Sequence, residues 1–268
     1  MLWIFIFSQQ KNNKMCKYIY FLLTLAIIGW HTHADAYELT PMSIELEEAG
    51  RNSTGTFRIH NTNDAPLTIE LSAVRRLLED GYYNTTEAAD DDFLLMPPQA
   101  YIEPGQFQVF RVRYMADKQL HQSVGYRVIF RQLPVDLSHI DGDRIQLLMN
   151  VHAPVYVSPL GAQPELDVSL HFDELTEVKN FFTSEINPRN EAGVVTIHNR
   201  GDGLQDLSTG VFKFYFDNGD PEELNWSDVS PAVFIRHVLP GGESKIPLEY
   251  VSKLEGRRVA GVEFIDKR

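Results

Sequence analysis

Four arginines in two predicted strands are the side chains best suited to binding a charged ligand. Arg111 and Arg113 share the polar face of a strand predicted at 107–114, and Arg127 and Arg131 come from the neighbouring predicted strand. The planar guanidinium group suits a bidentate grip on a carboxylate. Because the chain has a formal net charge of −13, four cations in two short strands predict a local anion site.

A second pattern suits backbone pairing with a partner. Ile145, Leu147, Met149 and Val151 follow one another at two-residue spacing, and Leu148 is the one apolar residue on the opposite face. Alternate residues of a strand point to the same side, so these four define one apolar face. Two interpretations remain open: the face packs in the core of its own domain, or it lies at an edge that receives another chain. The residues by themselves favour ordinary core packing.

Enzymatic chemistry finds little support in the sequence. The nine histidines are scattered, and none belongs to an HExxH, paired-histidine or Cys/His cluster. No GxSxG, P-loop or GxGxxG motif is present. Glu174 and Glu177 could imitate a glycosidase pair, but nothing orders them, and Asp90 to Asp92 are expected to be a solvated acidic loop rather than a cation site. We therefore expect no catalytic residue, no metal and no cofactor.

The first 36 residues have the features of a cleaved export signal. Three lysines precede a short apolar stretch at 18–30, and Ala34 to Ala36 supply small residues for cleavage after Ala36. Removing three Lys and one Asp changes the formal charge from −13 to −15, which argues against nucleic acid as a partner. The mature chain has no second long apolar run, so we expect no membrane insertion and predict a periplasmic location.

The remainder is predicted to be an all-β chain. Short runs rich in Val, Ile, Phe, Tyr and Thr alternate with Gly, Pro, Asn and Asp clusters, as in antiparallel sandwiches. A weak internal repeat pairs residues 57–61 with 195–199, and each copy is followed by a Pro-Gly turn. We expect two sandwich domains, at 37–158 and 159–268, because Pro159 and Gly161 end a long predicted strand.

The first domain resembles the PapD-like periplasmic pilus chaperones. The resemblance rests on three motifs in the family's order: Pro97-Pro98 with Pro104-Gly105 and 109–112, then 125–134, and then the long strand at 147–159. It implies two immunoglobulin-like sandwiches joined in a boomerang with a cleft between them. Typical members carry an arginine and a lysine that grip the subunit's C-terminal carboxylate. Ser43 and Pro154 occupy those places here, which is similar to the divergent, archaic branch.

The resemblance also implies how the protein works. A pilus subunit would be completed by a donor strand carrying Ile145, Leu147, Met149 and Val151, and then delivered to an outer-membrane usher. Burying four such side chains is worth about 6–12 kcal/mol before ordering costs. An exposed apolar edge is an aggregation hazard, so self-association of the free protein would cover it.

The family comparison also assigns the arginines. The arginine aligned with Arg111 belongs to an interdomain salt-bridge network in that family, so Arg111 is expected to be structural. Arg113 and Arg131 are the better candidates for the carboxylate anchor, and Arg127 is the third.

Two rival functions remain. A secreted β-sandwich adhesin or carbohydrate-binding protein would display a cluster of exposed aromatic side chains, for which Tyr82, Tyr83 and Trp226 are the faint candidates. A β-sandwich hydrolase would need acidic residues that converge on one point.

Overall fold

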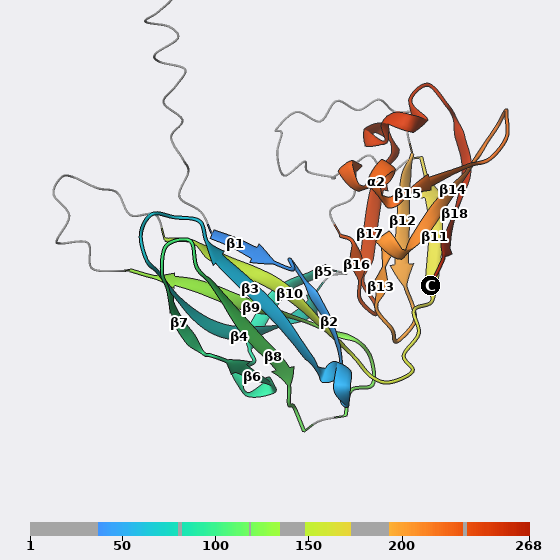
Figure 1. Ribbon diagram of the computed structural model, residues 1–268. Helices are drawn as coiled ribbons and strands as arrows, with labels where there is room; N and C mark the ends of the chain where they lie inside the picture. The colour runs from blue at the N-terminus through green and yellow to red at the C-terminus, as the bar shows by residue number, and fades with distance from the viewer. Residues whose placement is uncertain (1–36, 80–81, 118, 135–147, 173–192, 233–234) are drawn as a thin grey trace, which may run out of the picture. The chain divides into compact units, whose positions relative to one another are not determined.

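Strands of alternating polarity form nearly all of the structure (Figure 1). The computed structural model describes residues 37–79, 82–117, 119–134, 148–172, 193–232 and 235–268. Within this part of the chain, the one α-helix is α2 (Trp226–Val229), and no helix is long and apolar enough to cross a membrane. Short 3-10 turns lie at η1 (Arg51–Ser53), η2 (Asp90–Asp92), η3 (Leu207–Thr209), η4 (Ser230–Ala232), η5 (Leu248–Tyr250) and η6 (Ser252–Leu254).

The first ten strands form two sheets. They are β1 (Tyr37–Thr40), β2 (Ile44–Glu47), β3 (Thr54–Asn61), β4 (Leu67–Glu79), β5 (Tyr82–Ala88), β6 (Phe93–Met96), β7 (Gln99–Ile102), β8 (Phe107–Tyr114), β9 (Val124–Leu133) and β10 (Asn150–Ser158). One sheet has the order β1-β3-β8-β6, and the other has the order β2-β10-β9-β4-β5 with β7 also paired to β4. The chain therefore changes sheets between β1 and β2. We call these two sheets the first sandwich.

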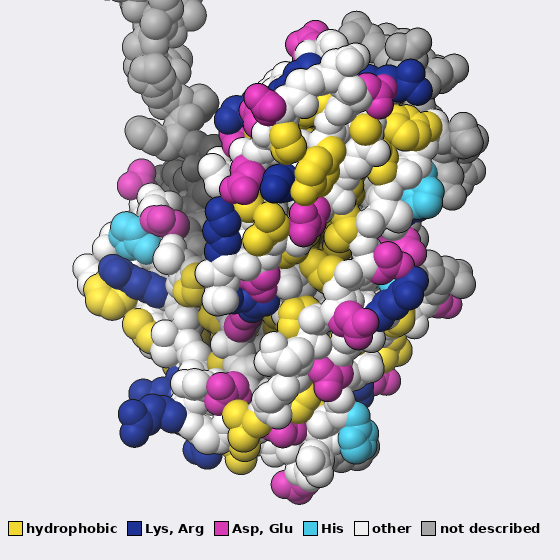
Figure 2. Space-filling view, turned by 90° about the vertical axis from the view of Figure 1, so that its right-hand side faces the viewer, with side chains coloured by type: hydrophobic (Ala, Val, Ile, Leu, Met, Phe, Trp, Pro, Cys, Tyr) yellow, Lys and Arg dark blue, Asp and Glu magenta, His cyan; other side chains and the backbone are white. Residues whose placement is uncertain are grey.

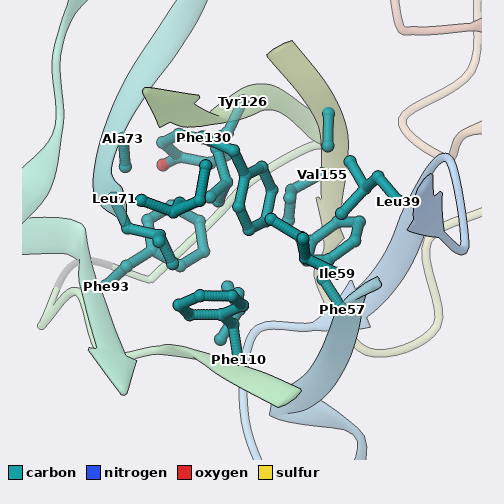
Figure 3. Packing of buried hydrophobic residues seen from close by; sticks show 14 of the residues in the cluster. Leu39, Phe57, Ile59, Leu71, Ala73, Phe93, Phe110, Tyr126, Phe130 and Val155 are labelled. Atoms are coloured by element: carbon teal, nitrogen blue, oxygen red, sulfur yellow. The ribbon is translucent and has the colours of Figure 1, made fainter. Parts of the chain in front are cut away.

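The core of the first sandwich explains its alternating sequence. In β8, Phe110, Val112 and Tyr114 are buried while the residues between them face outward. The ring of Phe130 from β9 meets Phe110 edge-on with centroids 5.7 Å apart, and it meets Phe57 from β3 at 5.3 Å. Figure 3 shows these rings packed between the two sheets. Edge-to-face aromatic pairs add to the free energy of apolar burial, so this cluster fixes how the sheets face each other.

The remaining strands form the second sandwich. They are β11 (Leu166–His171), β12 (Val194–Asn199), β13 (Gln205–Asp206), β14 (Gly210–Phe216), β15 (Glu222–Asn225), β16 (His237–Val238), β17 (Glu243–Pro247) and β18 (Val259–Asp266). They pair as β11-β12-β17, β13-β16 and β15-β14-β18, around a separate core that includes Ile197, Phe212 and Ile246. The predicted all-β fold of two sandwiches is confirmed. The boomerang with its cleft and the domain boundary at Ser158 stay predictions.

The internal repeat corresponds to a repeated structure. Asn61 is buried and donates to the carbonyls of Ala65 and Ile102 at 2.9 and 3.0 Å. Asn199 is buried in the same way and donates to the carbonyls of Gly203 and Val238 at 2.7 and 2.9 Å.

The two Pro-Gly turns complete the repeat. Gly105 N donates to the Asn61 carbonyl at 2.9 Å, and Gly241 N donates to the Asn199 carbonyl at 2.8 Å. Both glycines have a positive φ, of 70° and 73°, which other residues rarely adopt. Each sandwich thus has one buried asparagine at the end of a strand, and the backbone carbonyl of that asparagine is hydrogen-bonded to the glycine of a later Pro-Gly turn.

Candidate functional site

Strand β10 is paired along only part of one side. Its antiparallel ladder with β9 runs from Asn150 to Val157. On the other side, β2 pairs in parallel with residues 155–158, and no other described strand pairs with residues 150–154 there. This stretch is a free strand edge among the described residues, and an unpaired edge is a template for another strand.

The direction of the backbone groups follows from two hydrogen bonds. Gln132 N in β9 donates to the Met149 carbonyl at 3.0 Å, and Glu48 N donates to the Ser158 carbonyl at 2.9 Å. Peptide groups alternate sides along a strand, so odd-numbered residues of β10 bond to β9. The peptide groups of Asn150, His152 and Pro154 therefore face the free edge.

The four predicted donor residues are only partly described. Ile145 and Leu147 lie outside the described residues. Met149 immediately precedes β10 and is 38% exposed, and Val151 is half-buried against the core of the first sandwich. Leu148, on the opposite face, is 47% exposed. The face of Met149 and Val151 continues inward as Ala153, Val155 and Val157, which are buried, so the apolar face passes from the core to an exposed end.

The arginines occupy two different sheets. Arg111 and Arg113 lie exposed on β8, whereas Arg127 and Arg131 lie on β9. Since β8 pairs with β3 and β6, and β9 with β4 and β10, the two strands are not neighbours. The core residues between them show that the two arginine pairs point away from opposite sides of the sandwich. The prediction that all four form one anion site is therefore wrong, because the strands follow each other in sequence but pair in separate sheets.

Arg111 and Arg131 also differ from expectation in their partners. Arg111 forms no ion pair with another residue that the structure describes, so the interdomain network expected for it is not seen there. Arg131 Nη1 lies 3.7 Å from Glu70 Oε2, with both side chains about half exposed. Exposed pairs of this kind contribute little to stability.

Arg127 lies next to one of the two positions where the chain departs from the family pattern. It is half-buried and stands opposite Pro154 across the β9–β10 ladder. The β2 register, with Ile44 opposite Val155, places Ser43 beside Pro154 on the other side. Pro154 is therefore the direct cross-strand neighbour of Arg127, and Ser43 lies one strand further away.

A second arginine, Arg76, lies on the same outer face and escaped the sequence prediction. Val74 of β4 is the ladder partner of Arg127, and Arg76 is the next β4 residue on that face. Arg76 donates through Nε and Nη2 to the Tyr83 carbonyl at 3.2 and 2.9 Å. Burial lowers the pKa of the Arg76 guanidinium below its usual value, and repulsion from Arg127 adds to this shift. The tandem arginines at 75 and 76 inside a predicted strand were the signal available in the sequence.

Two of the three aromatic candidates of the rival binding hypothesis make contacts within the protein. Tyr83 donates its hydroxyl to the Pro240 carbonyl at 2.7 Å and packs on the cluster of Tyr156, Leu204 and Leu239. Trp226 packs against the second core, and the side chain of Tyr82 is not described. The pair Glu174 and Glu177 lies outside the described residues.

The acidic loop is structural. Asp90 Oδ1 accepts the Ala73 N–H at 2.7 Å, and Asp92 Oδ2 accepts the Tyr126 hydroxyl at 3.0 Å. The expectation of a purely solvated loop is wrong for these two carboxylates, because each satisfies a polar group of the first sandwich.

The visible surface carries mixed charge. On the face shown in Figure 2, Lys and Arg side chains are interspersed with Asp and Glu, and hydrophobic side chains lie between them. This face has no broad region of one sign that would steer a charged partner.

Three solved structures illustrate what this chain is similar to. The chain resembles the CsuC–CsuE chaperone–tip adhesion subunit pre-assembly complex from archaic Csu pili of Acinetobacter baumannii, with 13% identity, 87% of this chain and 93% of that chain covered, and a TM-score of 0.48. The chain is 11% identical to a chain of the SafA pilin–SafB chaperone complex of Salmonella enterica, with 88% of this chain and 98% of that chain covered and a TM-score of 0.48. The chain is 12% identical to the E. coli chaperone DraB, with 89% of this chain and 98% of that chain covered and a TM-score of 0.47.

The family comparison rests on sequence. A search of curated proteins finds no match. Residues 38–163, however, match the family model described as the pili and flagellar-assembly chaperone, PapD N-terminal domain. Chaperones of this family are a non-enzymatic class and act in the periplasm. The resemblance inferred from the sequence is thereby confirmed, and the first sandwich of this chain is an N-terminal domain of the PapD-like pilus chaperone family.

Proposed function

We propose that this protein binds a newly exported pilus subunit by donor-strand complementation and delivers it to an outer-membrane usher. The observation that carries the proposal is the free edge of β10 at residues 150–154, where β2 does not reach. In β-strand addition, backbone hydrogen bonds supply affinity and alternate side chains supply specificity. An incomplete subunit would pair with this edge.

The apolar side chains next to this edge favour the same function. Met149 is exposed at the end of a face whose inner members are buried. Ile145 and Leu147 would extend that face by two-residue steps. A subunit groove that accepts these side chains would remove them from water, which explains why an apolar strand end can be tolerated on an exported protein.

The carboxylate anchor is proposed to be Arg127. It is half-buried opposite Pro154, and the Arg76 guanidinium adds positive charge nearby. Arg113 and Arg131 remain the alternatives. Arg113 lies on the other sheet and Arg131 faces Glu70, so each is less well placed to bind a carboxylate next to the free edge.

Residues 1–36 are proposed to be the cleaved signal that brings the protein to the periplasm, and they lie outside the described residues. Before a subunit arrives, self-association through the same edge would protect it from aggregation.

The donor-strand assignment is tested by replacing one face of the strand and leaving the other face intact. Leu147→Asp and Met149→Asp each place a charge on the proposed donor face, and both should abolish periplasmic accumulation of a coexpressed pilus subunit. Leu148→Asp is the matched control, because Leu148 is exposed on the opposite face.

The variants are first compared by thermal melting, so that a folding defect is recognised. Normal accumulation of the subunit with folded Leu147→Asp and Met149→Asp would exclude the donor strand. Equal loss with Leu148→Asp would exclude the face specificity on which the assignment depends.

A further inference from the structure

Three side chains from separate strands converge outside the edge just described. Glu45 in β2, Asp206 in β13 and His237 in β16 each offer one ligand atom, and these atoms lie within 4.8 Å of one another. His237 Nε2 lies 3.4 Å from Glu45 Oε1 and 3.6 Å from Asp206 Oδ2. One imidazole nitrogen thus faces two carboxylate oxygens.

The strand pairings hold this arrangement in place. Asp206 and His237 are direct partners in the β13–β16 pair, and Glu45 is the partner of Tyr156 in the β2–β10 pair. The Tyr156 ring stacks on the His237 ring with centroids 4.4 Å apart and an interplanar angle of 29°. The imidazole is therefore fixed by its own strand and by an aromatic neighbour from the first sandwich.

The distances suit a shared metal ion better than direct hydrogen bonds. A normal N–H···O hydrogen bond spans about 2.7–3.2 Å, and both contacts of His237 Nε2 are longer. Two ligands at about 2.0–2.1 Å from a tetrahedral zinc ion lie about 3.3 Å apart. The nitrogen–oxygen separations of 3.4 and 3.6 Å are close to that value.

The carboxylate of Asp206 is prepared as an oriented ligand. Arg236 donates to Oδ1 through Nε at 2.8 Å and to Oδ2 through Nη2 at 2.5 Å, and Ser208 N donates to Oδ1 at 2.8 Å. Burial disfavours the charged form, but these hydrogen bonds outweigh it and lower the pKa of Asp206 to about 2. Metal-binding carboxylates and imidazoles are commonly oriented by such outer partners.

The site is closed on one side and open on the other. The side chains of His237 and Asp206 are 8% and 7% exposed, whereas that of Glu45 is 48% exposed. An ion could enter past Glu45, and water could complete its coordination. The two carboxylates outnumber the single Arg236 cation, so a divalent ion meets a net negative site.

We propose that Glu45 Oε1, Asp206 Oδ2 and His237 Nε2 bind a zinc ion, with water as the fourth ligand, and so fasten β2 to the β13–β16 pair. One imidazole and two carboxylates with an open position are a ligand set that zinc accepts. The Arg236 charge weakens the attraction, so the site should bind zinc reversibly. Because β2 flanks β10, zinc would also stabilise the sheet that carries the free edge.

The test is calorimetric titration of zinc sulfate into the exported protein, purified without a histidine tag and treated with chelator. The wild type should bind one zinc ion per chain and melt at a higher temperature with zinc. Glu45→Gln and His237→Gln should weaken binding on the order of tenfold or more. His60→Gln is the matched control and should behave like the wild type, because the exposed His60–Glu38 pair, at 3.9 Å, has no third ligand among the described residues.

Glu45 is half exposed, so its replacement is informative even if His237→Gln fails to fold. Zinc binding that is unchanged in Glu45→Gln and His237→Gln would place the ion elsewhere and overturn the proposal. Absence of zinc binding by the wild type would overturn it as well.

Discussion

Pro154 in β10 stands directly opposite Arg127 in β9 across the antiparallel ladder. The peptide nitrogen of Pro154 faces the free edge, so its missing N–H costs no hydrogen bond to β9. The family's lysine is therefore replaced by a residue that keeps the ladder intact, while a cation from the next strand occupies the same neighbourhood.

The first prediction concerns that cation. Arg127→Ala should weaken subunit binding by about 2 kcal/mol, roughly 30-fold, because a charge-assisted hydrogen bond to the subunit's terminal carboxylate is lost. Binding is measured by titrating the protein with a peptide of the subunit's C-terminal strand. Arg131→Ala and Arg113→Ala should change it far less. If either control variant weakens peptide binding strongly and Arg127→Ala does not, the carboxylate anchor is the control residue and not Arg127.

The second prediction uses the alternation of peptide groups in β10. His152→Pro removes an N–H that faces the free edge, so folding should be preserved while subunit capture is lost. Val151→Pro removes an N–H on the β9 side and should destabilise the fold by about 3 kcal/mol or more. Urea unfolding and subunit copurification distinguish the two variants. Normal capture by a folded His152→Pro variant would argue that the subunit does not pair at this edge.

The third prediction concerns the contact between Tyr83 and Pro240. Tyr83→Phe removes the hydroxyl that donates to the Pro240 carbonyl at 2.7 Å and should lower the free energy of unfolding by about 1 kcal/mol. The exposed Tyr101 provides the matched variant Tyr101→Phe, which should have no effect. Equal urea midpoints for the two variants would show that the hydroxyl contributes nothing.

The fourth prediction is a pH dependence. The folded-state pKa of Asp206 is lowered from 3.8 to about 2, so its contribution to stability is complete above pH 4 and is lost as the pH falls toward 2. In chelator at pH 7, Asp206→Asn should cost about 2 kcal/mol. The difference from the wild type should shrink below pH 4, be small at pH 2 and vanish below it.

The control for this experiment is Asp167→Asn, since Asp167 pairs with Arg200 on the surface. Its effect at pH 7 should remain below about 1 kcal/mol. A cost for Asp206→Asn that is independent of pH would contradict the assignment of the effect to its ionised carboxylate.

Local patterns predicted most of the fold. Strand β8 alternates buried and exposed residues as its sequence indicates, and the repeated Asn and Pro-Gly pairs make equivalent hydrogen bonds in both sandwiches. The first half of β4 alternates in the same way, with Leu67, Ile69, Leu71 and Ala73 buried in the core. The alternation depends only on the spacing of residues along one strand. The Pro-Gly turns depend on a positive φ, which glycine adopts readily.

The sequence by itself determined that this is an all-β chain with an apolar strand end and a family resemblance in its first half. The tertiary structure alone decided that β8 and β9 lie in different sheets, which separates Arg111 and Arg113 from Arg127 and Arg131. It also brought Glu45, Asp206 and His237 together. The physical reason is that side-chain periodicity encodes which face of a strand is buried, whereas strand pairing across the sandwich is fixed by core packing between distant segments.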